Sequence, residues 1–138
     1  MLDLTRLPDW DRRLARVVNR HISLPGEWGV ADCLLTFADA VEAVTGTDPA
    51  ASIRGSYKTA RGALGLIKRK GFDDVEAVLA SLFPPVGRLL AQRGDGGIVE
   101  RDGMLAAGFI CDRGFAMKVE TGLLFLPQTE IKSAFKVG

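Results

Sequence analysis

The sequence predicts an α+β fold in one domain over residues 1–138, with N-terminal helices packed on a small antiparallel β-sheet. Apolar residues recur at helical spacing up to about residue 92. After Gly94, short apolar runs alternate with glycine-containing turns, which is typical of strands joined by hairpins. A length of 138 residues fits one domain, and no linker or internal repeat divides it.

The clearest predicted helix spans residues 32–45. Asp32 belongs to the residue types whose side chains accept hydrogen bonds from the first free amides of a helix, so we expect it to be the N-cap. Gly46 follows the last apolar position, where glycine readily adopts the left-handed conformation that ends a helix. The apolar stripe expected to pack on the sheet consists of Leu34, Phe37, Val41 and Val44.

Three further helices are predicted. The first opens at Pro8–Asp9, and the segment 21–30 after it is expected to be a loop because it contains a proline and two glycines. The second covers residues 58–70. The third opens at Asp73, which with Glu76 is spaced as in a capping box.

Four strands are predicted after these helices, because turn signals at 102–103, 112–114 and 120–122 separate four apolar runs. Such strands form an antiparallel meander. The runs are GGIV, MLAAGFIC, FAMKV and LLFL. A short closing helix that contains Ile131 and Phe135 is expected to follow.

Composition and charge exclude several classes of function. With 18 basic and 17 acidic residues the net charge is +1, whereas proteins that track nucleic-acid phosphates carry a clear basic excess. No apolar run approaches the ~20 residues of a membrane helix, so no membrane insertion is expected. The first residues lack the pattern of a secretory signal, which favours synthesis in the cytoplasm.

The chain has two cysteines, Cys33 and Cys111, and one histidine, His21. They are too few for a disulfide scaffold, and their spacing matches no common zinc site, so neither a metal nor a cofactor is predicted. Cys111 ends an apolar run and is expected to be buried.

Cys33 is the main candidate for chemistry. It falls in the first turn of the helix over 32–45, where the helix dipole stabilises a thiolate, so it is a candidate nucleophile. The alternative is a small apolar residue buried under the sheet, as free cysteines often are. Asp32 beside it is a second candidate catalytic residue that could pair with a cation, besides its expected role as N-cap.

The pattern Trp28-Gly29-x-x-Asp32-Cys33, followed by an apolar helix, resembles the nucleophile motif of the NlpC/P60 cysteine peptidases. The resemblance implies a papain-like fold, with Cys33 as nucleophile and with Trp28 and Gly29 beside the cleft. The segments 93–97 and 106–110 resemble two of the core strands of that family.

The chain departs from that family at the base. Where active members carry the base histidine, this sequence has Ala106, and no histidine follows Cys33. A cysteine hydrolase needs a group that accepts the thiol proton and later protonates the leaving amine. Three other side chains are candidates for that role: His21 could fold back beside the loop, and Lys118 and Glu120 could face the cleft. The favoured expectation is that His21 ends a helix, facing solvent or the helix dipole, and that Lys118 and Glu120 lie on the solvent side of a strand.

The insert with Asp48-Pro49 and Arg54-Gly55-x-Tyr57 makes nearly the whole chain resemble a DUF6950-type family of small phage and prophage proteins. The resemblance implies other phage tail proteins as partners, and a path from the host cytoplasm during assembly to the virion. Arg54 and Tyr57 are expected in a plain turn or, alternatively, in a contact surface of the cleft.

Two functions are therefore considered. The first is a phage or phage-like tail component with an inactive NlpC/P60-like scaffold, which acts through protein–protein contacts in tail assembly. The alternative is an active cysteine hydrolase of cell-wall (peptidoglycan) peptides that uses Cys33 with an atypical or partner-supplied base. A freestanding thiol-redox protein is disfavoured because the chain has no C-x-x-C.

Overall fold

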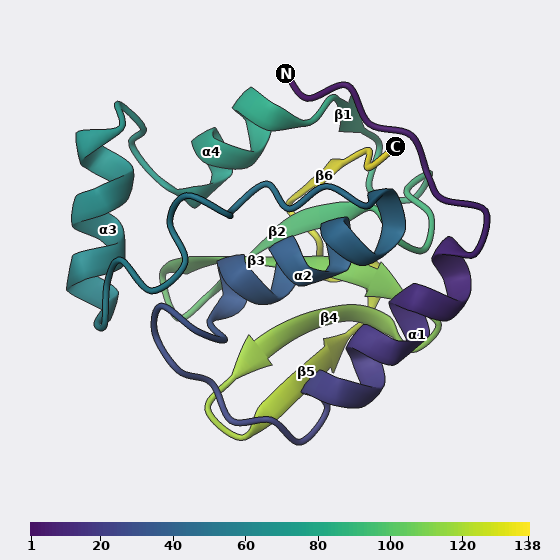
Figure 1. The fold of residues 1–138 in the computed structure, drawn as a ribbon, viewed down its shortest axis with the longest axis horizontal. Helices are drawn as coiled ribbons and strands as arrows, with labels where there is room; N and C mark the ends of the chain where they lie inside the picture. The colour runs from purple at the N-terminus through teal and green to yellow at the C-terminus, as the bar shows by residue number, and fades with distance from the viewer.

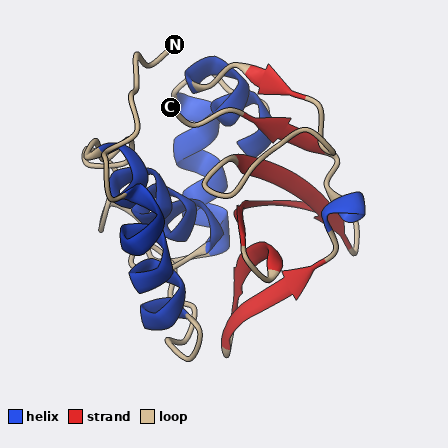
Figure 2. Ribbon diagram, turned by 90° about the vertical axis from the view of Figure 1, so that its right-hand side faces the viewer, coloured by secondary structure: helices blue, strands red, loops and turns tan.

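A computed structural model describes all residues, 1–138, and confirms the α+β prediction. Helices lie mainly on one side and the strands on the other, with the two chain ends close together (Figures 1 and 2). The helices are α1 (Trp10–His21), α2 (Cys33–Thr45), α3 (Ala60–Arg69) and α4 (Val75–Leu82). The predicted helix over 58–70 is thus present in a slightly shorter form, as α3.

The strands form one six-stranded sheet in the order β1-β6-β2-β3-β4-β5, and all recorded pairs are antiparallel. The predicted four-stranded meander is confirmed, and it forms the last four strands in this order. The strands are β1 (Pro85–Val86), β2 (Gly96–Arg101), β3 (Met104–Cys111), β4 (Gly114–Val119), β5 (Gly122–Leu126) and β6 (Ser133–Phe135).

The predicted closing helix with Ile131 and Phe135 is wrong. Only Gln128–Glu130 form a single 3-10 turn, after which the chain becomes β6. Phe135 lies opposite Gly96 of β2, so β6 pairs with the strand edge that the meander leaves open. The unpaired N–H and C=O groups of that edge favour a strand, and so short an apolar segment has no periodicity strong enough to oppose it.

Helix α2 contacts both α1 and the central strands β3 and β4 of the sheet. Asp32 is its N-cap, and its side chain accepts a hydrogen bond from the Leu35 amide at 2.9 Å. Gly46 ends it at φ 82°. The expected stripe faces the main core: Phe37 and the two valines are fully buried, and Leu34 is half-buried. α2 therefore has the start, end and buried face that the sequence predicts.

The capping box predicted at α4 is wrong by one residue. Asp74, not Asp73, caps the helix. Glu76 does not reach back to the cap; its carboxylate accepts from Lys132 Nζ at 2.7 Å and from the Ser133 hydroxyl. The Glu76 carboxylate thus attaches α4 to β6, and its contact with Ser133 joins residues 57 positions apart in the sequence.

Two apolar cores lie on the two faces of the sheet. The main core, under α1, α2 and α4, includes Phe37, and its ring meets Phe83 edge to face with centroids 5.5 Å apart. A Cβ on Gly96 would collide with the Phe37 ring, so the glycine at the start of β2 is a packing requirement. The second core, on the other face, includes Val99, Phe115, Met117 and Ile131.

We predict that Phe37→Ala lowers the free energy of unfolding by about 3–5 kcal/mol, because the lost ring leaves a cavity against Phe83 and Gly96. Urea denaturation followed by circular dichroism measures this change. Leu89→Ala is the control; Leu89 is 66% exposed, and its loss should cost less than about 0.5 kcal/mol. Equal effects of the two substitutions would contradict the packing described.

Candidate functional site

The carboxylate of Asp32 organises the loop before α2. Besides the Leu35 amide, it accepts hydrogen bonds from the Gly29 amide at 3.0 Å and from the Tyr57 hydroxyl at 2.6 Å. Asp32 is 6% exposed, so these bonds replace water around a buried charge. Burial, followed by the bond to Asp32, raises the pKa of Tyr57. Its hydroxyl therefore keeps its proton near neutral pH and donates it to the Asp32 carboxylate.

Cys33 lies between two open clefts. The α3 cleft, of about 450 Å3, is mostly apolar; the β4 cleft is about 280 Å3. The α3 cleft is lined by Trp28, Asp32, Cys33, Leu34, Tyr57, Ala60, Arg61, Ala63, Leu64, Ile67, Asp74, Val75, Gly103, Met104 and Leu105. The β4 cleft is lined by Gly26, Glu27, Trp28, Asp32, Cys33, Met104, Leu105, Ala106, Met117, Lys118, Val119 and Glu120. Trp28 borders both and is 43% exposed, as expected of a cleft residue.

The β4 cleft opens where β3 and β4 separate. Their recorded pairs are confined to residues 109–111 and 114–116, next to the turn. Further along, residues 104–106 of β3 and 117–119 of β4 line the cleft. Cys33 lines the same cleft as these two strand segments.

The Cys33 thiol is poorly suited to act as a nucleophile. Burial raises its pKa from 9.0 to about 11; the Ala107 backbone acts in the opposite direction, and the Asp32 charge raises it again. A helix N-terminus stabilises a nearby anion by about 0.3–1 kcal/mol, which is less than the ~1.4 kcal/mol that corresponds to a pKa shift of one unit. The dipole of α2 therefore does not offset burial, although Cys33 as a residue keeps some exposed surface.

Ala106 borders the same cleft as Cys33, but its side chain lies on the other face of the sheet. Residues of β3 alternate between faces: Ala107 belongs to the main core with Phe37, whereas Ala106 packs against the second core, which includes Val99. A side chain at position 106 therefore points away from α2, whereas positions 105 and 107 lie on the face that α2 covers.

The expectation that His21 faces solvent is wrong. His21 is 1% exposed, and its Nε2 lies 2.8 Å from Oδ2 of Asp39 on α2. Its Nδ1 has no hydrogen-bond partner. The only imidazole of the chain is therefore bound to a carboxylate inside the protein and does not contact Cys33.

Lys118 also differs from expectation, because it is buried rather than on the solvent side. Its Nζ donates to the carbonyl oxygens of His21 and Leu24, at 3.0 and 2.6 Å. Burial lowers the pKa of Lys118. Glu120 is exposed, as expected, at the rim of the β4 cleft. No side chain makes a hydrogen bond to the Cys33 sulfur, so neither residue takes the place of the absent base.

Arg54 lines neither cleft. It forms ion pairs with Asp39 and with Asp48, each at 2.8 Å. Burial alone would raise the pKa of Asp39, but the hydrogen bond from His21 and the charges of Arg54 and Arg20 hold it below its ordinary value. Arg54 therefore attaches the loop 48–57 to α2, and of the two residues of the insert only Tyr57 borders the α3 cleft.

Sequence reasoning did not identify the α3 side of the site. Leu64, Ile67 and Met104 line the α3 cleft, and Leu64 and Met104 are 47% and 67% exposed. Exposed apolar residues on a helix with glycines at 62 and 65 were the available signal, but nothing local shows that α3 faces the turn between β2 and β3.

The other residues considered in the sequence add no second chemical centre beside Cys33 in the two clefts. Cys111 is buried, as expected, and both cysteines are free thiols. No cluster of three or more histidine, cysteine or acidic residues could hold a metal ion. No helix combines the length and apolarity needed to cross a bilayer.

A family model described as "Domain of unknown function (DUF6950)" matches residues 5–137. Comparisons with curated proteins and with solved structures found no match.

We predict that alkylation of Cys33 by iodoacetamide is slow at pH 7 and accelerates about tenfold per pH unit toward pH 11, because only the thiolate reacts. Peptide mapping by mass spectrometry separates Cys33 from Cys111. The same peptide in the unfolded protein is the control and should titrate near the free-thiol value of about 8.5. Rapid alkylation of folded Cys33 near pH 6 would show an activated thiol instead.

Proposed function

The chain belongs to the DUF6950 family, and we propose that it is a phage or phage-like tail component that binds partner proteins through the α3 cleft and does not hydrolyse peptides. One observation carries the proposal: an open apolar cleft lies beside a cysteine that has no proton-transfer partner. The resemblance of the insert to small phage and prophage proteins supports the tail setting. Assembly would then take place in the host cytoplasm, before the protein enters the virion.

The chemistry around Cys33 argues against hydrolysis. A thiolate can attack an amide, but the tetrahedral intermediate returns to reactants unless the leaving amine is protonated. His21 is held by Asp39, and the Lys118 ammonium by two carbonyl oxygens. The papain-like scaffold that we propose here would therefore have kept the cysteine without the acid and base that make it catalytic.

The α3 cleft has the properties of a protein-binding surface. Its lining is mainly apolar, and the large side chains of Trp28, Leu64 and Met104 remain exposed around it. Apolar surface that gathers in a concave site is a common mark of a binding interface. Arg61 and Asp74 add charges to the lining, as in the polar rims of known interfaces.

The alternative, a cysteine hydrolase of cell-wall peptides, is favoured by one feature. Cys33 lies in the first turn of α2 and borders both open clefts, so a peptide could reach it. Activity would then require a base and an acid from a partner protein.

We predict that the isolated protein does not cleave synthetic stem peptides, as followed by chromatography of the products. A catalytic acid–base group contributes about 10²–10⁴-fold, and none faces the thiol. Ala106→His is not expected to restore cleavage, because position 106 lies on the far face of the sheet. Cleavage by the wild type that Cys33→Ala abolishes would refute the non-hydrolytic proposal.

We predict that Leu64→Asp lowers incorporation of the protein into tail particles at least about tenfold, because an unpaired charge is costly in an apolar interface. The protein would be expressed with the tail proteins encoded beside it, and purified particles quantified by mass spectrometry. Leu89→Asp, the same change at an exposed leucine outside the cleft, should leave incorporation unaffected. Absence of the wild type from the particles, or equal loss with both variants, would contradict the proposal.

A further inference from the structure

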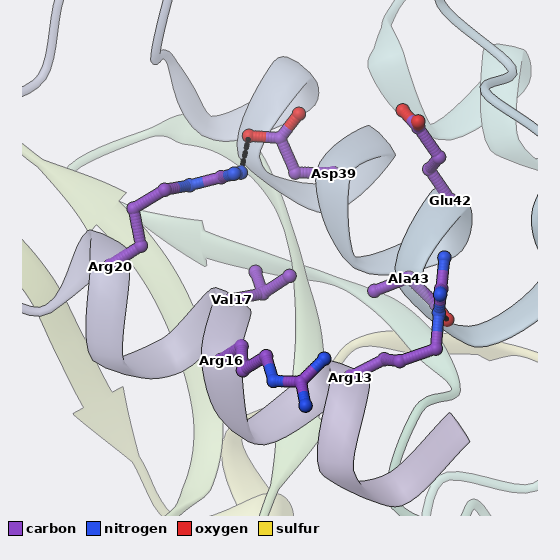
Figure 3. Close-up of a pocket in the computed structure, with 7 residues that line it drawn as sticks. All are labelled: Arg13, Arg16, Val17, Arg20, Asp39, Glu42 and Ala43. Atoms are coloured by element: carbon purple, nitrogen blue, oxygen red, sulfur yellow. Dashed lines mark hydrogen bonds and ion pairs between the residues drawn. The ribbon is translucent and has the colours of Figure 1, made fainter. Parts of the chain in front are cut away.

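A third open groove, lined mainly by charged residues, lies between α1 and α2 and is separate from the α3 and β4 clefts (Figure 3). Its volume is about 380 Å3. Arg13, Arg16 and Arg20 enter it from α1, and Asp39 and Glu42 face them from α2. The arginines follow one another at three- and four-residue spacing, so they form a row about 10 Å long on one side of the helix.

Two of the arginines are held in place, and the third is free. Arg13 Nε donates to the Ala43 carbonyl at 2.8 Å, and Arg20 pairs with Asp39 at 3.0 Å. Arg16 forms no hydrogen bond or ion pair, and only one of the five N–H groups of Arg13 is used. The row therefore presents guanidinium N–H groups that are partly held in position and that have no acceptor within the protein.

The carboxylates of the groove neutralise Arg20 but leave Arg13 and Arg16 without an ion pair. Asp39 accepts from Arg20, His21 and Arg54, so its charge is already balanced by its own neighbours. Glu42 is exposed and forms no ion pair. The side chains of Val17 and Ala43 supply the two apolar lining positions.

We propose that this groove binds an acidic helix of a partner protein, with carboxylates at three- and four-residue spacing that pair with Arg13 and Arg16. A guanidinium pairs with a carboxylate through two parallel hydrogen bonds, which suits a row of arginines with free N–H groups. A helix laid along α1 would place its acidic side chains at the same spacing as the arginines. The proposal does not depend on the role of the α3 cleft.

Nucleic acid fits the groove less well. The chain as a whole carries a net charge of only +1, whereas proteins that track nucleic-acid phosphates carry a clear basic excess. No aromatic side chain lines the groove to stack on a base, and Trp10 at the start of α1 already packs against Arg6 and Arg93, whose guanidinium carbons lie 4.3 and 5.5 Å from its ring centroid.

The test uses a fluorescent helical peptide with glutamate at three- and four-residue spacing, titrated with the full chain and followed by anisotropy at low salt. Arg16→Glu should weaken binding at least about tenfold, because it replaces a free guanidinium by a carboxylate that repels the glutamates of the peptide. Arg12→Glu is the matched control: it makes the same charge change on the same helix outside the groove, and should weaken binding less than about threefold. Arg16 has no contact to lose, so thermal unfolding should be unchanged.

Glu42→Gln gives an opposite signature that misfolding cannot produce. Removal of the uncompensated carboxylate should tighten binding of the acidic peptide about twofold or more. The proposal is overturned if the peptide does not bind, or if Arg12→Glu and Arg16→Glu weaken it equally. It is also overturned if a single-stranded oligonucleotide of the same charge binds more tightly through Arg16, or if sedimentation shows Arg16-dependent self-association instead.

Discussion

The buried carboxylate of Asp32 is the constraint on which the rest of the site depends. It holds the Gly29 turn and the start of α2, which are adjacent in the chain, and joins them to Tyr57, 25 residues away. Loss of this acceptor would leave three buried donors without a partner, at a cost of about 1–3 kcal/mol for each unsatisfied group. The same charge raises the pKa of the adjacent Cys33. The residue that shapes the loop therefore also makes the thiol less reactive.

A second carboxylate on α2, Asp39, explains why the chain has no free imidazole. It forms ion pairs with Arg20 and Arg54 and binds the His21 ring, and so joins the end of α1 to the loop 48–57. Lys118 attaches β4 to the same region by donating to the carbonyl oxygens of His21, the last residue of α1, and of Leu24 just after it. The groups that could have moved protons near Cys33 are thus engaged in holding helices, loop and sheet together. This structural use of polar residues agrees with a protein that works by binding.

The two surfaces proposed for binding differ in their chemistry. The α3 cleft is apolar and bordered by Trp28, whereas the groove between α1 and α2 is lined by arginines. The first suits a partner that buries apolar side chains, and affinity there would depend little on salt. The second suits an acidic partner, and its association would be sensitive to salt and fast at low ionic strength. Two such surfaces would allow one chain to join two different neighbours in an assembly.

The sequence by itself determined the features that depend on near neighbours: the Asp32 cap and Gly46 end of α2, the tight turns of the meander, and the absence of a base histidine after Cys33. These follow from backbone conformation and hydrogen bonds within a few residues. Only the tertiary structure decided that the segment around Phe135 is a strand, that His21 is buried against Asp39, and that Ala106 faces away from α2. Each of these depends on a surface supplied by distant residues, such as the open edge of β2 or the buried face of α2, and no local pattern carries that information.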